Sequence, residues 1–369
     1  MSSNSSLVFI PPRMLFMALS INLLTDPSAV TANPAHITPI DTFAWRFPGV
    51  IIAAATTFLL ILFGKNLFNS ERVGFIAAFL YTFDGMTFAM ARVAMNDVYL
   101  TFFVLLSAYI ALMTIKNRSY TLPNFVLLGI SLGLAVSTKW SAFLMYGFLL
   151  ALFTLLIPQR FSLKSLGKLL VLALLPLVIY ILSYSQWWLA GLTPRTFFSL
   201  IQESVRYQFG TTQTHDYSSP AWTWPVMWRP VYLYLGDFPG TSSKIYAMGN
   251  PLVWLPGVAF VVAAIFLSIK TKNRLLLFLT MFYFVMFIPW VLSPRIMFLY
   301  HYLPSAAFLM LISGYVLSTI FTKSRLLRNT VLIYLAAVVI AFVYFYPHWS
   351  ALGINPSWDE TYYWLNSWR

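Results

Sequence analysis

Few side chains in this sequence can ionise, and several of them stand at the ends of long apolar stretches. Arg92-Val-Ala-Met-Asn-Asp97 places a cation and a carboxylate in one short segment, and Lys139 follows Ser137-Thr138. A carboxylate can orient or deprotonate a hydroxyl, and a fixed cation can stabilise an anion. We expect Asp97 to pair with Arg92 and to orient a site. The alternatives are a local ion pair with Asp97 as a helix cap, and a lysine that reaches the membrane surface.

A second group of candidate residues lies between positions 188 and 304. The guanidinium groups of Arg229 and Arg295 have the planar fork that binds phosphate. Sugar or acceptor binding is expected of His215, Tyr217, Trp224 and His301. An interfacial aromatic belt is the preferred alternative for Trp222 and Trp228. A packed, hydrogen-bonded histidine is the alternative for His301, and contact with lipid headgroups is the alternative for Arg295.

Motifs of soluble cofactor chemistry are absent from the sequence. We find no Walker loop, no dinucleotide-binding glycine pattern and no zinc-ligand spacing. The net charge of +13 would suggest nucleic acid only if the basic residues shared a soluble face. They stand instead in short segments between apolar stretches. We therefore expect no metal, no cofactor and no nucleic-acid partner.

The elements that position these residues are apolar helices. Of the 369 residues, 60% are hydrophobic and 9% are charged, whereas a soluble domain has about 25% charged residues. A membrane span needs about 20 apolar residues and must be helical where it faces lipid. The sequence predicts an all-α integral membrane protein with ten spans, at about 48–64, 73–91, 97–115, 123–139, 141–157, 166–187, 251–269, 274–292, 299–321 and 328–347.

Lysine and arginine predict the orientation of these spans. Five basic clusters fall on the same side when the spans are counted, and that side is predicted to be cytoplasmic. The opposite side then receives residues 1–47, the turns at 92–97, 139–140 and 295, the loop 188–250 and the tail 348–369. The apolar stretch 7–24 contains Pro11-Pro12 and is interpreted as an interfacial or re-entrant helix.

Ten short stretches resemble, in order, the protein O-mannosyltransferase family, multi-pass glycosyltransferases of GT-C architecture that use polyprenyl-phosphate donors. The matching stretches are Trp45-Arg46-Phe47-Pro48, Asp84-Gly85, Arg92 to Asp97 with Leu100-Thr-Phe-Phe103, Ser137-Thr-Lys-Trp140, His215-Asp-Tyr-Ser218, Trp224-Pro225, Arg229-Pro230, Gly249-Asn250-Pro251, Arg295 to Pro304, and Tyr344-Phe-Tyr-Pro347.

The resemblance implies transfer of mannose, with inversion, from polyprenyl- or dolichyl-phosphate mannose to Ser or Thr of a secreted protein. It implies a single GT-C-like membrane domain in the plasma membrane with its active face outside the cytoplasm. On this reading Arg92 and Asp97 are catalytic, and Arg295, Arg229 and Lys139 bind the carrier phosphate. We expect these groups to converge on one cavity beside an apolar groove for the lipid tail.

The family pattern has one feature that this sequence does not match. The family begins with a further helix and a loop with an Asp-Glu pair, whose Asp is the catalytic base, before a His-Pro-Pro-Leu-Gly-Lys stretch. Ile10-Pro11-Pro12-Arg13-Met14 stands in the comparable place, so we expect a chain truncated at its N-terminus. The Asp359-Glu360 pair of the tail is expected to be solvated, and its use as a substitute base is the less favoured alternative.

Three other functions stay open. The first is a related lipid-carrier-dependent glycosyltransferase that acts on a glycan or a lipid. The second is a transporter or channel, which is disfavoured because no string of ionisable groups continues through successive spans. The third is an inactive fragment or scaffold that lacks the catalytic Asp-Glu loop.

Overall fold

A computed structural model of the protein describes residues 39–93, 95–210 and 214–369. The predicted interfacial helix at 7–24 and the Ile10 to Met14 stretch lie outside the described residues. The principal helices are α3 (Pro39–Leu62), α4 (Glu71–Thr82), α5 (Gly85–Met90), α6 (Asn96–Lys116), α7 (Leu122–Thr138), α8 (Ala142–Leu156), α9 (Leu163–Leu182), α12 (Pro251–Lys270), α13 (Arg274–Val291), α14 (Leu303–Phe321) and α15 (Arg325–Ser350).

The described residues form a multi-pass helical membrane protein, as predicted. Seven helical segments are long and apolar enough to cross a bilayer: Thr42–Leu67, Asn96–Lys116, Leu163–Leu182, Pro251–Lys270, Arg274–Val291, Leu299–Phe321 and Arg325–Ser350. Two further apolar helices, α7 and α8, are shorter. Each of the ten predicted spans coincides with helix, and the number of ten crossings stays a prediction.

The predicted span 73–91 is two helices rather than one. The chain breaks at Asp84, whose carboxylate accepts a hydrogen bond from the Thr87 backbone N–H and thereby caps α5. The other carboxylate oxygen accepts from the backbone N–H of Asn250, 2.8 Å away. Asn250 in turn donates through its side chain to the carbonyls of Phe83 and Val338. A buried carboxylate therefore joins α4, α5, α12 and α15.

Glycine permits the close approach of α3 and α4. A methyl group added at Gly64 would lie 2.0 Å from the backbone nitrogen of Gly74, so no larger residue fits. Gly64 belongs to a π-helical turn, η2 (Phe63–Leu67), that ends the first span. Small residues at helix contacts are typical of membrane bundles, because burial from lipid supplies no hydrophobic driving force.

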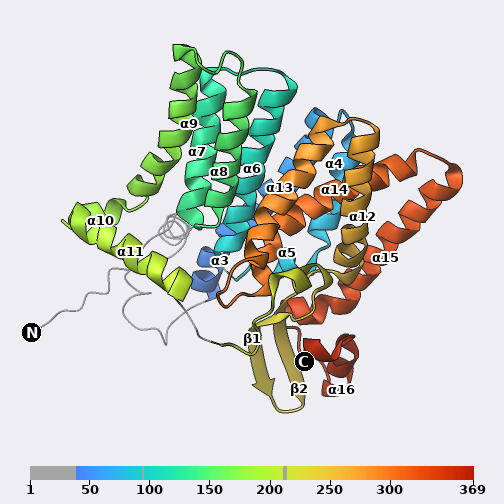
Figure 1. Cartoon of the computed structure of the whole chain (residues 1–369). Coiled ribbons are helices and arrows are strands. Elements are labelled where there is room, and N and C mark those ends of the chain that lie inside the picture. Colours follow the sequence, from blue (N-terminus) through green and yellow to red (C-terminus); the bar gives the residue numbers. More distant parts are fainter. Residues whose placement is uncertain (1–38, 94, 211–213) are drawn as a thin grey trace, which may run out of the picture.

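Several of the basic inter-helix connections meet at one end of the bundle. Lys116 donates from Nζ to the carbonyl of Asn66, and Arg72 lies over the ring of Phe321, 4.7 Å from its centroid. These contacts join the α3–α4, α6–α7 and α14–α15 connections. The turns with the candidate site residues lie at the other end, together with α10 (Ser185–Leu189), α11 (Pro194–Gly210) and a β-hairpin (Figure 1).

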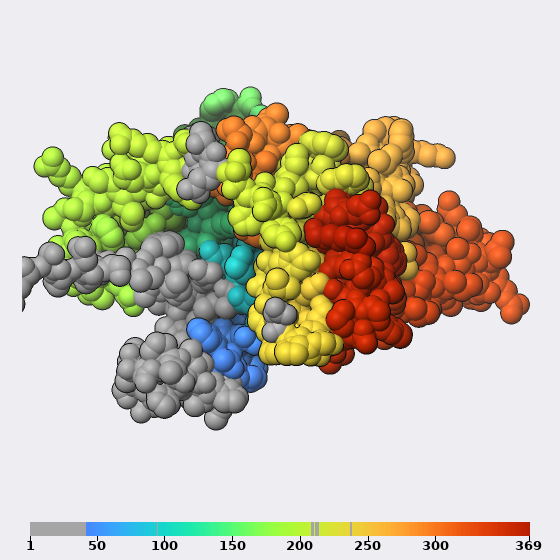
Figure 2. All heavy atoms as spheres, turned by 90° about the horizontal axis from the view of Figure 1, so that it is seen from below, coloured from blue at the N-terminus to red at the C-terminus, as the bar shows by residue number. Residues whose placement is uncertain are grey.

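The hairpin was not predicted from the sequence. Strands β1 (Val231–Phe238) and β2 (Thr241–Ala247) pair antiparallel, and the rings of Tyr232 and Tyr246 lie 4.1 Å apart. The C-terminal tail packs against this hairpin through α16 (Pro356–Asp359) and the short 3-10 helices η5 (Glu360–Tyr362) and η6 (Asn366–Trp368). Figure 2 looks onto this end of the molecule and shows the tail, in red, beside the hairpin, in yellow.

The expectation of a solvated tail is wrong for Asp359. Its side chain is buried and bonds to the ammonium of Lys244 on β2 and to Nε2 of His348 on α15, which is 2.6 Å away. Burial alone would raise the pKa of Asp359, but the hydrogen bonds from Lys244 and His348 outweigh it and leave the pKa lowered. Asp359 is therefore a structural anion that holds the tail, and it is not available as a base.

Candidate active site

A cavity of about 580 Å³ opens at the end of the bundle that contains the hairpin. It lies between the α7–α8 turn, α9, α11 and the segment that follows α13. Its polar lining includes Asn96, Ser137, Lys139, Tyr180, Tyr184, Ser204 and Arg295, and its apolar lining includes Val136, Phe143, Leu144, Leu200 and Leu292. Two of the three predicted phosphate-binding residues, Lys139 and Arg295, thus meet at one cavity with an apolar wall.

Lys139 is fixed by an ion pair with Asp97. Its Nζ lies 2.7 Å from the Asp97 carboxylate, which is 2% exposed, while the lysine side chain is 21% exposed. Asp97 stands in the first turn of α6, where the helix dipole favours a negative charge. Lys139 directly follows α7, so the pair joins the end of α7 to the start of α6. The carboxylate thereby holds the ammonium at the edge of the cavity.

The expected pairing of Asp97 with Arg92 is wrong. The guanidinium of Arg92 donates from Nη2 to the carbonyl of Trp349 and lies over the ring of Phe88, 3.8 Å from its centroid. Arg92 follows α5, whereas Asp97 stands in the first turn of α6, and the two side chains bond to different partners. Arg92 lines a separate cavity, so the described residues do not place all the predicted groups in one site.

Arg295 reaches the cavity from the segment between α13 and η4 (Leu299–Tyr302). Nη2 lies 3.4 Å from Nε2 of His301, the guanidinium lies 5.6 Å from the ring centroid of Trp290, and Nε is buried without a hydrogen-bond partner. Burial lowers the pKa of Arg295, and the negative potential of Tyr300 and Tyr207 opposes that effect. An arginine remains charged under these conditions, so Arg295 brings a fixed positive charge to the cavity.

Two predicted sugar-binding residues are packed inside the protein. Trp224, in η3 (Ala221–Val226), is fully buried and donates from Nε1 to Ser219. Its ring stacks on His301, with centroids 6.0 Å apart. His301 is also buried, and Nδ1 lies 3.0 Å from the carbonyl of Phe298. The expectation that Trp224 contacts a sugar is therefore wrong. His301 packs inside the protein and contacts the guanidinium of Arg295.

His215, Tyr217 and Arg229 form a separate group near the hairpin. Arg229 donates from Nε to the carbonyl of Asp216 and lies over the ring of Tyr217, 5.4 Å from its centroid. The ring of His215 packs edge-on against Phe298 at 5.1 Å. None of the three lines the cavity formed by Lys139 and Arg295. The described residues thus separate Arg229 from the other two predicted phosphate ligands.

The structure adds Asn96, Tyr180 and Tyr184 to the candidates. Asn96 Oδ1 is buried without a hydrogen-bond partner, and Asn96 lines the cavity beside Lys139. The hydroxyls of Tyr180 and Tyr184 are 2.9 Å apart on one face of the α9 end, and Tyr180 also accepts from Trp140. Asn96 lies within the Arg92 to Asp97 motif and was overlooked because an amide does not titrate. The i, i+4 spacing of the tyrosines was the available signal for them.

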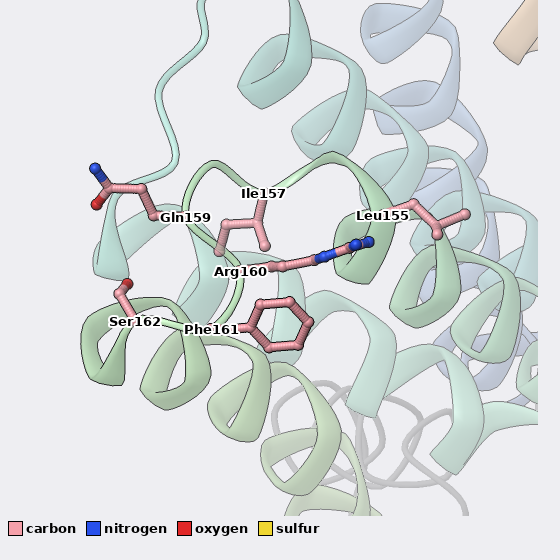
Figure 3. A pocket seen from close by; sticks show the side chains of 6 residues that line it. All are labelled: Leu155, Ile157, Gln159, Arg160, Phe161 and Ser162. Atoms are coloured by element: carbon pink, nitrogen blue, oxygen red, sulfur yellow. The ribbon is translucent and has the colours of Figure 1, made fainter.

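A further cavity, of about 440 Å³, lies between α8 and α9 at the opposite end of the bundle (Figure 3). Its lining includes Gln159, Ser162 and one charged residue, Arg160, whose guanidinium lies 5.1 Å from the ring centroid of Phe161. No predicted site residue lines it. The cavity with Lys139 and Arg295 is therefore the better candidate for chemistry.

Comparisons with known sequences cover almost the whole chain. Residues 14–200 match the family described as dolichyl-phosphate-mannose-protein mannosyltransferase, and residues 193–368 match the C-terminal four-transmembrane region of protein O-mannosyltransferase. The polyprenol-phosphate-mannose–protein mannosyltransferase of Mycolicibacterium smegmatis is 24% identical over 88% of this chain and 77% of its own length. The protein of the same name from Mycobacterium tuberculosis is 25% identical over 89% and 77%.

Solved structures share the fold at low sequence identity. The S. cerevisiae protein O-mannosyltransferase Pmt1–Pmt2 complex, bound to the sugar donor, aligns with 98% of this chain and 86% of its own, with a TM-score of 0.79 and 13% identity. ArnT from Cupriavidus metallidurans aligns with 89% and 52%, with a TM-score of 0.58 and 14% identity. The fold is that of GT-C membrane glycosyltransferases, and the two family matches together extend from residue 14 to residue 368. The chain belongs to the protein O-mannosyltransferase family.

Proposed function

We propose that this protein transfers mannose from polyprenyl-phosphate mannose to Ser or Thr hydroxyls of proteins, with inversion at the sugar. Family membership supports the reaction class, and the relatives from mycobacteria are named for this donor and for protein acceptors. The observation that carries the proposal is the meeting of Lys139 and Arg295 at one partly apolar cavity. An amphiphile with a phosphate head fits such a cavity.

The two cations stabilise the departing phosphate. Negative charge grows on the phosphate as its bond to the sugar breaks, and cations already held in place lower the barrier without reorganising. Asp97 holds Lys139 through the 2.7 Å ion pair, and His301 and Trp290 surround Arg295. The apolar wall, including Val136, accommodates the first part of the lipid tail, which burial favours by about 0.8 kcal/mol per CH₂.

The cavity accounts for donor binding and not for deprotonation of the acceptor. No carboxylate of the described residues lines it, and the carboxylate of Asp97 is already engaged by Lys139. Asn96 Oδ1, which has no partner, is placed to accept a hydrogen bond from a sugar hydroxyl. In our proposal Asp97 thus acts through Lys139, and Asn96 is a candidate sugar ligand.

The proposed place of reaction is the extracytoplasmic face of the plasma membrane. Support comes from the basic connections, which meet at the end of the bundle opposite the cavity. Cytoplasmic loops of membrane proteins are enriched in lysine and arginine. The cavity then faces outward, where secreted proteins present their hydroxyls.

Arg295→Ala tests the proposal. Washed membranes containing the full chain are incubated with polyprenyl-phosphate mannose labelled in the sugar and an acceptor protein, and protein-bound label is measured. We expect the rate to fall by about 10²- to 10³-fold, as for the loss of one preorganised donor. Arg195→Ala, at an exposed arginine of α11 outside the cavity, is the matched control and should retain the wild-type rate.

Two results would contradict the proposal. Unchanged transfer by the Arg295 variant would remove Arg295 from phosphate stabilisation. Label recovered in an extracted lipid or a free glycan, rather than in protein, would favour the related glycosyltransferase with a different acceptor.

A further inference from the structure

A second cavity at the same end of the bundle is lined, among the described residues, by two arginines and by no acid. It has a volume of about 540 Å³ and lies between the start of α3, the end of α5, β2 and the end of α15. Arg46 of α3 and Arg92, which follows α5, both line it. Lys139 and Arg295 do not line this cavity, so it is distinct from the candidate active site.

Among the described residues, neither arginine is paired with a carboxylate. The ion pairs formed by the described residues include neither Arg46 nor Arg92. Arg92 uses Nη2 to donate to the carbonyl of Trp349, and its Nε is buried without a partner. Burial lowers the pKa of Arg92, the Tyr346 hydroxyl raises it, and the nearby charge of Arg46 lowers it further. Two cations that repel each other and have no carboxylate partner among the described residues are stabilised by an anion between them.

The cavity also has an apolar wall, which suits the hydrocarbon chains of a lipid. Phe43, Phe47 and Val50 line it, and all three also have large exposed surfaces on α3, a membrane-spanning helix. The exposed apolar surface continues along α3 through Ile51 to Phe58. A phosphate bound by the two guanidinium groups would leave attached acyl or prenyl chains free to run along this surface.

We propose that Arg46 and Arg92 form a binding site for the phosphate of an anionic membrane lipid, separate from the candidate active site. The planar guanidinium groups bind phosphate oxygens through paired N–H donors. The guanidinium of Arg92 stacks on the ring of Phe88, 3.8 Å from its centroid, and this contact restricts its orientation. The ligand class is a phosphate ester with apolar chains, and free phosphate lacks the chains that the α3 surface would contact.

The absence of cysteine from the sequence permits a site-specific test. Ser350 lines the cavity, and Ser350→Cys introduces a single thiol of similar size. The full chain in neutral detergent is treated with N-ethylmaleimide, and the alkylation rate is measured with increasing dioctanoyl phosphatidylglycerol. The probes for comparison are dioctanoyl phosphatidylcholine and inorganic phosphate. The measurement needs no sugar donor, so its outcome is independent of the proposed mannosyl transfer.

We expect saturating phosphatidylglycerol to slow alkylation at least tenfold, and phosphatidylcholine and phosphate to require at least tenfold higher concentrations for the same protection. Arg46→Gln in the Ser350→Cys background should raise the half-protecting concentration of phosphatidylglycerol about tenfold or more. Arg46 makes no ion pair within the described chain, so this variant tests binding rather than folding. Arg195→Gln is the matched control and should leave protection unchanged.

Several outcomes would overturn the site. Equal protection by the two phospholipids would show that the negative charge is irrelevant, and equal protection by inorganic phosphate would show that the apolar wall contributes nothing. Unchanged protection in Arg46→Gln would exclude the arginine pair. A thiol that fails to react without lipid would show that the cavity is closed.

Discussion

The ion pair between Asp97 and Lys139 provides the sharpest test of how the candidate active site is held together. Asp97→Asn keeps the size of the side chain and removes its charge, which leaves the ammonium of Lys139 without its partner. Breaking a buried ion pair on one side costs about 3–5 kcal/mol. The lysine side chain is 21% exposed, so water can solvate part of the charge, and we expect a loss of about 2–3 kcal/mol in the free energy of unfolding.

Lys139→Met has the opposite effect on charge. It leaves the Asp97 carboxylate, which is 2% exposed, without its partner. The free energy of unfolding should therefore fall by about 3–5 kcal/mol. The double variant has neither charge, and we expect it to cost at least about 2 kcal/mol less than the sum of the two single variants. Glu71→Gln is the control, because its ion pair with Lys65 is exposed on both sides and should contribute less than about 1 kcal/mol.

Unfolding in neutral detergent micelles and the labelled-mannose transfer assay measure the two consequences. Lys139→Met should lower kcat about 10²-fold, because it removes a preorganised cation. Asp97→Asn should lower kcat less, by about tenfold, because the ammonium remains but is less firmly placed. If the stability loss of the double variant equals the sum of the two single losses within about 0.5 kcal/mol, Asp97 and Lys139 are not coupled. A larger loss of kcat from Asp97→Asn than from Lys139→Met would refute the view that Asp97 acts through the lysine.

Two further predictions concern the tail and the helix contacts. The pKa of Asp359 is lowered in the folded protein, so its stabilising effect is present above its unfolded value near 3.9 and is lost as the pH falls. The difference in unfolding midpoint between wild type and Asp359→Asn should therefore be smaller at pH 3 than at pH 8; an equal or larger difference at pH 3 would contradict this. Gly64→Ala should lower the free energy of unfolding by about 3 kcal/mol or more, because its methyl group would meet the backbone of Gly74. Gly147→Ala, in open space on α8, should instead be neutral or stabilising by up to about 1 kcal/mol, and equal losses in both variants would exclude the steric cause.

The sequence predicted the helical segments well, because lipid imposes two simple conditions on each of them. A span must be apolar and must satisfy its own backbone hydrogen bonds, and both conditions are local. The break at Asp84 was not predicted, although Asp84 caps α5 locally, and its second bond comes from Asn250, 166 residues away. The hairpin was also missed, because both of its strands lie within residues 188–250, which the sequence analysis treats as one long loop.

The candidate site was predicted only in part, because residue types are visible in the sequence and contacts between distant segments are not. Residue types identified Lys139 and Arg295 as candidate anion ligands, and the structure brings them to one cavity. Proximity in sequence suggested Arg92 as the partner of Asp97, yet the partner is Lys139, 42 residues away on another helix. Short spacing within a turn does not reveal which way each side chain points. Burial of Trp224 and Asp359 likewise depends on segments distant in sequence.

The bond between Asp84 and Asn250 has a consequence for how the protein is made. The carboxylate is fully buried in the finished bundle and receives one of its hydrogen bonds from a residue translated 166 positions later. At about 5–20 residues per second, the ribosome needs roughly 10–30 s to cover that distance. Throughout this interval the growing polypeptide contains an acidic group between α4 and α5 that lacks the backbone donor of Asn250. The hydrogen bonds around Asp84 are thus completed only after Asn250, at the start of α12, has been synthesised.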